Sequence, residues 1–281
     1  MKKKKMNTKL KYFLGLLISF PLLPFLYFQG KSIRKKVPVL PEALRPTGFV
    51  NGQFKSNLSL LTIGESTIAG VGVKEHKDGF TGALAQTLSK VFQQNIEWRV
   101  YARSGYTAKQ LHTKIVPKIE ETTADLIVIG IGGNDAFTLN SPKKWSRDVE
   151  NLIQAVQHKF PKTPVFFTNM PPIKEFPAFT RFIKFVIGNL VEILGERLHI
   201  LADKKSNIYY NREVIRLKEW SAKNNLSPNN AGIYFSDGVH PSELTYQVWG
   251  KEMGTFISSQ NIHPTKLPIA PPKQKKSQSF P

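Results

Sequence analysis

The sequence contains no cysteine, and its acidic residues are few and absent from both ends of the chain. The lack of cysteine excludes disulfide bonds and thiolate metal sites. Lys and Arg number 40 against 20 Asp and Glu, which gives a formal net charge of +20. Residues 1–36 hold ten of these basic residues and residues 261–281 hold four, with no acid in either segment. Because about +6 remains for the 224 residues between them, we expect no nucleic-acid partner.

Residues 12–28, YFLGLLISFPLLPFLYF, form an apolar run of 17 residues without a charge. A membrane-spanning helix needs roughly 17–25 such residues, so the run is long enough for a single span. A cleaved signal peptide is disfavoured because FLYFQGKS offers Phe and Tyr where small residues must precede the cut. An interfacial hairpin bent at Pro21 and Pro24 is disfavoured because the run has no polar face. We therefore expect an uncleaved membrane anchor.

The charges that flank this run predict its orientation. Six lysines precede it and four basic residues follow it. The more positive flank tends to stay in the cytoplasm, which predicts a cytoplasmic N-terminus and an exported, periplasmic domain. The expected organisation is a basic N-terminus with its anchor over 1–36, a tether rich in Pro and Lys over 37–54, one domain over 55–262, and a disordered Pro- and Lys-rich tail over 263–281.

Between the tether and the tail, short apolar runs alternate with longer amphipathic segments. This alternation is typical of βαβ units and predicts a mostly parallel sheet that is covered on both faces. The expected strands are 58–63, 96–102, 126–131, 165–169 and 199–202. The expected helices are 80–94, 108–120, 145–160, 177–198 and 243–259.

Small polar motifs follow three of the predicted strands. GESTIAG with Ser66 follows the first, ARSGYTA with Gly105 the second, and GGND with Asn134 the third. Parallel sheets bind ligands beyond the carboxyl ends of their strands, so these motifs should meet at one edge. Taken singly, Ser66 could cap a helix, Gly105 could serve a positive φ, and GGND could be a turn.

A nucleophilic serine needs a base, and His240 is the best placed of the six histidines. It lies in FSDGVHPSE, three residues after Asp237, and an Asp-Gly turn can bring the carboxylate to the imidazole. The other five histidines lie in polar segments or in the tail. The alternative for this motif is an ordinary turn before a helix that Ser242 caps.

With these four motifs in this order, the chain resembles the GDSL or SGNH hydrolases. The resemblance implies a three-layer α/β/α fold with a mostly parallel five-stranded sheet. It also implies Ser66 as the nucleophile, His240 as the base and Asp237 as the group that orients it. The implied oxyanion hole consists of the Ser66 and Gly105 N–H groups and the Asn134 side chain. Neither a cofactor nor a metal is implied.

The sequence departs from the family pattern at two places. Glu65 stands where the family has Asp, and Arg103 and Ser104 precede Gly105 where an Asn is usual. We expect neither change to abolish catalysis, since the carboxylate that orients the base is Asp237.

The implied reaction is ester hydrolysis through an acyl-enzyme, and the sequence leaves its substrate open. A membrane anchor fits lipid or lysophospholipid esters, and it fits O-acetyl groups of envelope glycans equally well. The Phe-rich helix over 177–194 is expected to face the core, with an acyl-chain wall or a lipid-touching surface as the alternative. The alternative function is a non-catalytic binding or assembly module of the same fold at the membrane. The sequence predicts no oligomeric state.

Overall fold

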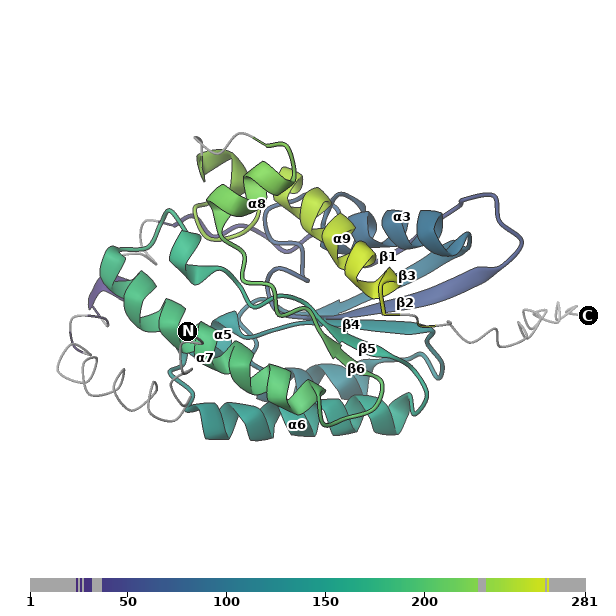
Figure 1. The fold of residues 1–281 in the computed structure, drawn as a ribbon, viewed down its shortest axis with the longest axis horizontal. Helices are drawn as coiled ribbons and strands as arrows, with labels where there is room; N and C mark the ends of the chain where they lie inside the picture. The colour runs from purple at the N-terminus through teal and green to yellow at the C-terminus, as the bar shows by residue number, and fades with distance from the viewer. Residues whose placement is uncertain are drawn as a thin grey trace, which may run out of the picture.

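The computed structural model describes residues 37–226, 231–260 and 262, together with 24, 26 and 28–31 (Figure 1). The expected anchor over 12–28 lies largely outside the described residues, and so does the expected tail over 263–281. Among the described residues, no helix combines the length and the apolar character that crossing a membrane requires.

The described residues form a sheet of six strands, five of which are parallel (Figure 1). The strands are β1 (Thr47–Val50), β2 (Asn57–Gly64), β3 (Asn95–Ala102), β4 (Leu126–Gly130), β5 (Val165–Phe167) and β6 (Ile208–Tyr210). Their order is β1-β3-β2-β4-β5-β6, and only β1 runs antiparallel to its neighbour. The first four predicted strands are confirmed, and β2 lies at the centre between β3 and β4.

Two parts of the sheet differ from the prediction. The strand expected at 199–202 is wrong, because these residues continue the preceding helix to Ala202 and the fifth parallel strand is β6. The run HILA keeps the helical spacing of buried positions, with Leu198 and Ala202 both in the core. β1 lies inside the segment expected to be a tether over 37–54, so ordered structure begins before residue 55.

Helices cover both faces of the sheet. They are α3 (Phe80–Phe92), α4 (Ala108–Gln110), α5 (Gly133–Phe137), α6 (Pro142–Lys159), α7 (Arg181–Ala202), α8 (Leu217–Lys223) and α9 (Glu243–Ser258). Figure 1 shows α3 and α9 on one side of the strands and α6 and α7 on the other. The helix expected over 108–120 is broken into α4, a π turn (Leu111–Ile115) and a 3-10 turn (Val116–Lys118), and Pro117 in the last cannot donate a helical hydrogen bond.

The alternation of side chains along β2 explains the three layers. Leu61 and Ile63 are buried in the core under α6 and α7, while Leu58 and Leu60 are buried under α3 and α9. Since successive side chains of a strand point to opposite faces, a strand with buried apolar residues on both faces must be covered on both sides. The three-layer α/β/α fold is confirmed, and α7 buries its apolar face in the core as expected.

Candidate active site

Ser66 lies at the carboxyl end of the central strand. β2 ends at Gly64, and the ladder continues one step further, since Glu65 N–H donates to the Gly130 carbonyl at 3.1 Å. A tight turn follows, in which Val71 N–H donates to the Ser66 carbonyl at 3.1 Å. Because residues 66–72 form turns and α3 begins only at Phe80, Ser66 does not cap a helix. That alternative is wrong.

The buried Glu65 carboxylate ties the Ser66 loop to the loop after β4. Its Oε1 accepts from Gly133 N–H at 2.8 Å, and its Oε2 accepts from Asn134 N–H at 2.9 Å and from Asn134 Nδ2 at 2.6 Å. Burial raises the pKa of Glu65 to about 7, although the hydrogen bonds from Asn134 and Gly133 oppose the shift. The side chain that departs from the family pattern therefore supports Asn134 directly, a role that sequence reasoning missed.

The loop that carries Gly105 is tied to the same place. Asn134 Nδ2 donates to the Tyr106 carbonyl at 3.1 Å, and the buried Asp135 carboxylate accepts from Ala108 N–H at 2.9 Å. Gly105 is exposed and has φ +83°, and a Cβ there would meet no neighbouring atom within 4 Å. Glycine is therefore favoured by the backbone conformation and not by close packing.

Glu42 is a further contributor that the sequence did not reveal. Its Oε1 accepts from Ser104 N–H at 2.7 Å, and its Oε2 pairs with Arg103 at 3.3 Å. The residue lies in the segment expected to be a tether, so nothing in its local pattern marked it as part of the site. Arg103 and Ser104, the second departure from the family pattern, are the residues that it holds.

Asp237 and His240 form the expected pair. Asp237 Oδ2 lies 2.7 Å from His240 Nδ1, while Asp237 Oδ1 accepts from the N–H groups of Val239 at 2.9 Å and His240 at 2.7 Å. The Asp237 side chain is fully buried, and that of His240 is 21% exposed. Burial alone would raise the pKa of Asp237, but the hydrogen bonds from His240 and Val239 hold it below its usual value. An ionised Asp237 keeps the proton on Nδ1, which leaves Nε2 as an acceptor.

Close packing brings the Asp237–His240 loop against the Ser66 loop. Gly72 has φ +108°, and a Cβ there would lie 2.5 Å from Ser236 Oγ and 2.6 Å from the Pro241 carbonyl. Tyr246 of α9 reaches the same turn and donates to the Val71 carbonyl at 2.8 Å. Among the described residues, however, no hydrogen bond joins the Ser66 hydroxyl to His240, and such bonds often tighten only when substrate binds.

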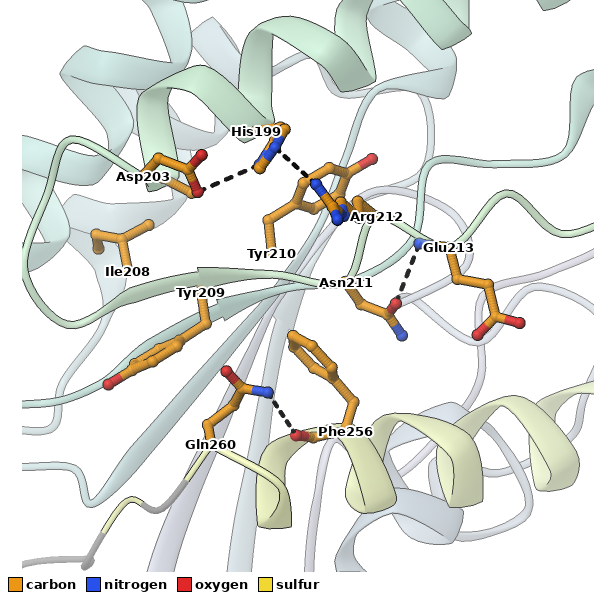
Figure 2. A pocket seen from close by; sticks show the side chains of 11 residues that line it. His199, Asp203, Ile208, Tyr209, Tyr210, Asn211, Arg212, Glu213, Phe256 and Gln260 are labelled. Carbon is orange, nitrogen blue, oxygen red and sulfur yellow. Dashed lines mark hydrogen bonds and ion pairs between the residues drawn. The ribbon is translucent and has the colours of Figure 1, made fainter. Parts of the chain in front are cut away.

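The remaining histidines that the structure describes lie elsewhere. His76 was expected in a polar segment, yet it is 5% exposed, and burial lowers its pKa to about 4. His199 lines a cavity of about 550 Å³ at the β6 edge, where it contacts Arg212 and Asp203 (Figure 2). None of the four sequence motifs contributes to this cavity.

A second cavity, of about 400 Å³, lies between α7 and the loops after β5 and β6. Met170 and Pro171 line it, and the same two side chains pack against Gly132 and Gly133 in the loop that carries Asn134. This cavity, unlike the one at the β6 edge, adjoins the candidate site.

Comparisons with known proteins agree with this fold. No match was found among curated proteins. Solved structures with the same fold include TesA, at 18% identity and a TM-score of 0.51, covering 72% of this chain and 98% of TesA. A family 3 carbohydrate esterase from Clostridium thermocellum matches at 16% identity and a TM-score of 0.53, covering 72% of this chain and all 100% of that one. An extracellular lipase from Streptomyces rimosus matches at 15% identity and a TM-score of 0.52, covering 72% of this chain and 99% of the lipase chain.

A sequence model of the GDSL-like lipase/acylhydrolase family matches residues 62–248, which include every motif described above. The chain therefore belongs to the GDSL-like lipase/acylhydrolase family and is a carboxylic ester hydrolase.

Proposed function

We propose that this protein is a membrane-anchored serine esterase that forms an acyl-enzyme at Ser66. Its substrates are lipid or lysophospholipid esters, or O-acetyl groups of envelope glycans. The observation that carries the proposal is the Asp237–His240 pair, which leaves Nε2 as an acceptor on a loop packed against the Ser66 turn. A non-catalytic binding module would need neither a buried Asp beside an imidazole nor a hydroxyl at the end of the central strand.

The proposed reaction has two halves. His240 Nε2 takes the Ser66 proton while Oγ attacks the ester carbonyl carbon, and the alcohol then leaves with the proton from His240. Water, deprotonated by the same nitrogen, attacks the acyl-enzyme and releases the acid. Asp237 stays ionised throughout and stabilises the imidazolium that forms in each half.

The developing oxyanion would be met by the N–H groups of Ser66 and Gly105 and by the Asn134 amide. Both Nδ2 hydrogens of Asn134 have acceptors in the structure, Glu65 Oε2 and the Tyr106 carbonyl. The reverse amide orientation would place Oδ1 against the Tyr106 carbonyl, which can only accept, so the amide nitrogen faces this carbonyl. Donation to an oxyanion would therefore share or replace one of these two bonds.

Replacement of Asn134 by Ala tests this role. Loss of one oxyanion donor costs about 10²–10³-fold in kcat, and we expect Asn134→Ala to fall in that range. The measurement is kcat for a p-nitrophenyl ester. Asn224→Ala is the control, because Asn224 donates to the Trp220 carbonyl and to Glu252, away from the loops of the site. An unchanged kcat for Asn134→Ala would remove this residue from the oxyanion hole.

The anchor and the export of the domain are part of the proposal. They are supported by the uncharged run over 12–28, by its basic flanks, and by the helical conformation of the described residues 24, 26 and 28–31. Protease protection in sealed membrane vesicles, with a tag at each end of the chain, would test the orientation.

The first experiment assays the full chain in detergent against p-nitrophenyl esters from acetate to palmitate. Ser66→Ala should lower kcat on the order of 10⁴-fold or more, while Ser259→Ala, which removes an exposed hydroxyl just after α9, should not. The chain-length optimum separates a deacetylase from a lipid esterase. Folded protein that hydrolyses no ester would favour the binding module.

A further inference from the structure

The end of the apolar N-terminal run docks beside the candidate site. Gln29, the first residue after the run over 12–28, accepts a hydrogen bond from Thr180 Oγ1 at 2.7 Å. Leu26, inside the run, packs against the core face that carries α6 and α7. Figure 1 shows the short helical segment, in purple, beside the start of α7. A helix rises 1.5 Å per residue, so Thr180 lies close to the level at which the apolar run ends.

The segment 176–180 ends at this docking point. It also lies between the loop that carries His240 and the segment that follows Asn134, and it contacts both. Ala178 N–H donates to the Gly238 carbonyl at 3.1 Å, between Asp237 and His240. The Phe179 ring lies 5.4 Å from that of Phe137, three residues after Asn134. The point where the anchor ends and the mouth of the site therefore share one short piece of chain.

Large apolar side chains are exposed around this segment. Phe137 and Leu139, which follow Asn134, are 42% and 45% exposed, and Phe185 on α7 is 48% exposed. We call these three residues the mouth patch. They lie on adjoining parts of the fold, because α5, which carries Phe137, packs against α7. Apolar side chains that gather in one exposed patch mark contact surfaces for proteins or membranes. The nearby Arg181 and Lys31 are exposed as well, and basic side chains are drawn to anionic headgroups.

We propose that the mouth patch rests in the phospholipid interface, so that the enzyme takes its ester substrate directly from the membrane. This inference rests on the proposed function, since it needs both the anchor and the site at Ser66. The patch faces lipid because Gln29, the residue that follows the apolar run, is hydrogen-bonded to Thr180 at the end of the segment 176–180. An ester group lying at the headgroup level would then reach Ser66 without crossing bulk water.

A depth measurement tests the position of the patch without depending on activity. The chain has no cysteine, so Phe185→Cys and Val91→Cys each give a single labelling site. Val91 is a matched control, because it is 46% exposed and lies at the far end of α3. The full chain is reconstituted in vesicles of phosphatidylcholine and phosphatidylglycerol and labelled with an environment-sensitive dye. Lipids with a quencher near the headgroup should quench the dye at position 185 and not at position 91.

An activity measurement tests the consequence. Phe185→Ser should lower hydrolysis of p-nitrophenyl palmitate embedded in the vesicles about tenfold, the loss expected when part of a large apolar contact is removed. The same variant should hydrolyse p-nitrophenyl acetate in water as fast as the unmodified chain. Val91→Ser should leave both rates unchanged.

The outcomes separate this inference from the proposed function. Equal quenching at the two positions, or none at 185, overturns the membrane-facing mouth even if Ser66→Ala abolishes activity. Quenching at 185 that needs no quencher lipid and grows with protein concentration also overturns it, because a second copy then covers the patch. Quenching at 185 alone supports the inference, while retained esterase activity in Ser66→Ala would overturn only the proposed function.

Discussion

At the scale of single residues, three carboxylates support the site, and each does so in a different protonation environment. Asp237 is buried yet held ionised by hydrogen bonds from His240 and Val239. Glu65 and Asp135 are buried with raised pKa values, and they accept backbone N–H groups from neighbouring loops. The first orients a catalytic base, whereas the other two fix the relative positions of the loops. Their roles follow from what each oxygen accepts.

The contribution of Asp237 can be measured by Asp237→Asn. This change should lower kcat on the order of 10⁴-fold, because the Asn amide can face Nδ1 with a donor and so favour the wrong imidazole tautomer. Binding of the ester should change far less, so the loss should be in kcat and not in KM. Asp203→Asn, at the other histidine–aspartate contact, is the control and should leave kcat unchanged. An Asp237→Asn enzyme of full activity would show that His240 needs no orienting group.

The site residues that the sequence predicted are marked by short motifs, whereas those that it missed act through contacts with residues far away in the chain. Asp237 and His240 are three residues apart and joined by a turn, so their pairing could be predicted. Ser66, Gly105 and Asn134 could be expected at one edge because each follows a strand, whereas their roles were implied by the family resemblance. The contacts of Glu65 with Asn134 and of Glu42 with Ser104 join residues 69 and 62 positions apart. Nothing in the local sequence encodes such long-range pairing.

At the scale of elements, the site is an arrangement of loops held by close backbone approach. Gly72 is the clearest case, because its positive φ and the absence of a side chain let residues 236–241 pack directly on the Ser66 turn. The sequence prediction was wrong for residues 199–202 and did not include β1, and in both cases contacts with distant parts of the chain decide the structure. Residues 199–202 are helical because they form the last turn of α7, whose Leu198 and Ala202 are buried in the core. β1 forms because the edge of β3 is available to pair with it.

Substitution of Gly72 by Ala should separate the two loops. A Cβ at this position must displace Ser236 or Pro241, so we expect Gly72→Ala to lower kcat more than tenfold through movement of His240. Gly70→Ala is the matched control: Gly70 also has positive φ, at +69°, but its Cβ would meet Ala43, outside the His240 loop. Both variants should lose stability to backbone strain, about 1 kcal/mol each. Equal activity losses in the two would contradict the packing argument.

At the scale of the whole molecule, two buried groups give the stability opposite dependences on pH. The pKa of Glu65 is raised from 4.5 to about 7, so the folded state holds its proton longer and stability falls as pH rises between these values. The pKa of His76 is lowered from 6.5 to about 4, so stability is lost as pH falls through that window. The two effects partly cancel near pH 5 to 6.

The variant Glu65→Gln isolates one of these two effects. The difference in unfolding free energy between the variant and the unmodified chain should change between pH 4.5 and about 7, in favour of the variant at the higher pH. The change should be on the order of 3 kcal/mol, from about 1.4 kcal/mol per unit of pKa. Urea unfolding at a series of pH values measures it. A constant difference across this range would mean that Glu65 ionises normally in the folded chain.

The hydrogen bond from Tyr246 to the Val71 carbonyl has a consequence for the time at which the chain acquires activity. It joins residues 175 positions apart, and Tyr246 is fully buried in α9. The turn that carries Ser66 is thus completed by a helix that is synthesised after all six strands of the sheet. A nascent chain must therefore include α9 before it can hydrolyse an ester, and a product that stops short of α9 should be inert.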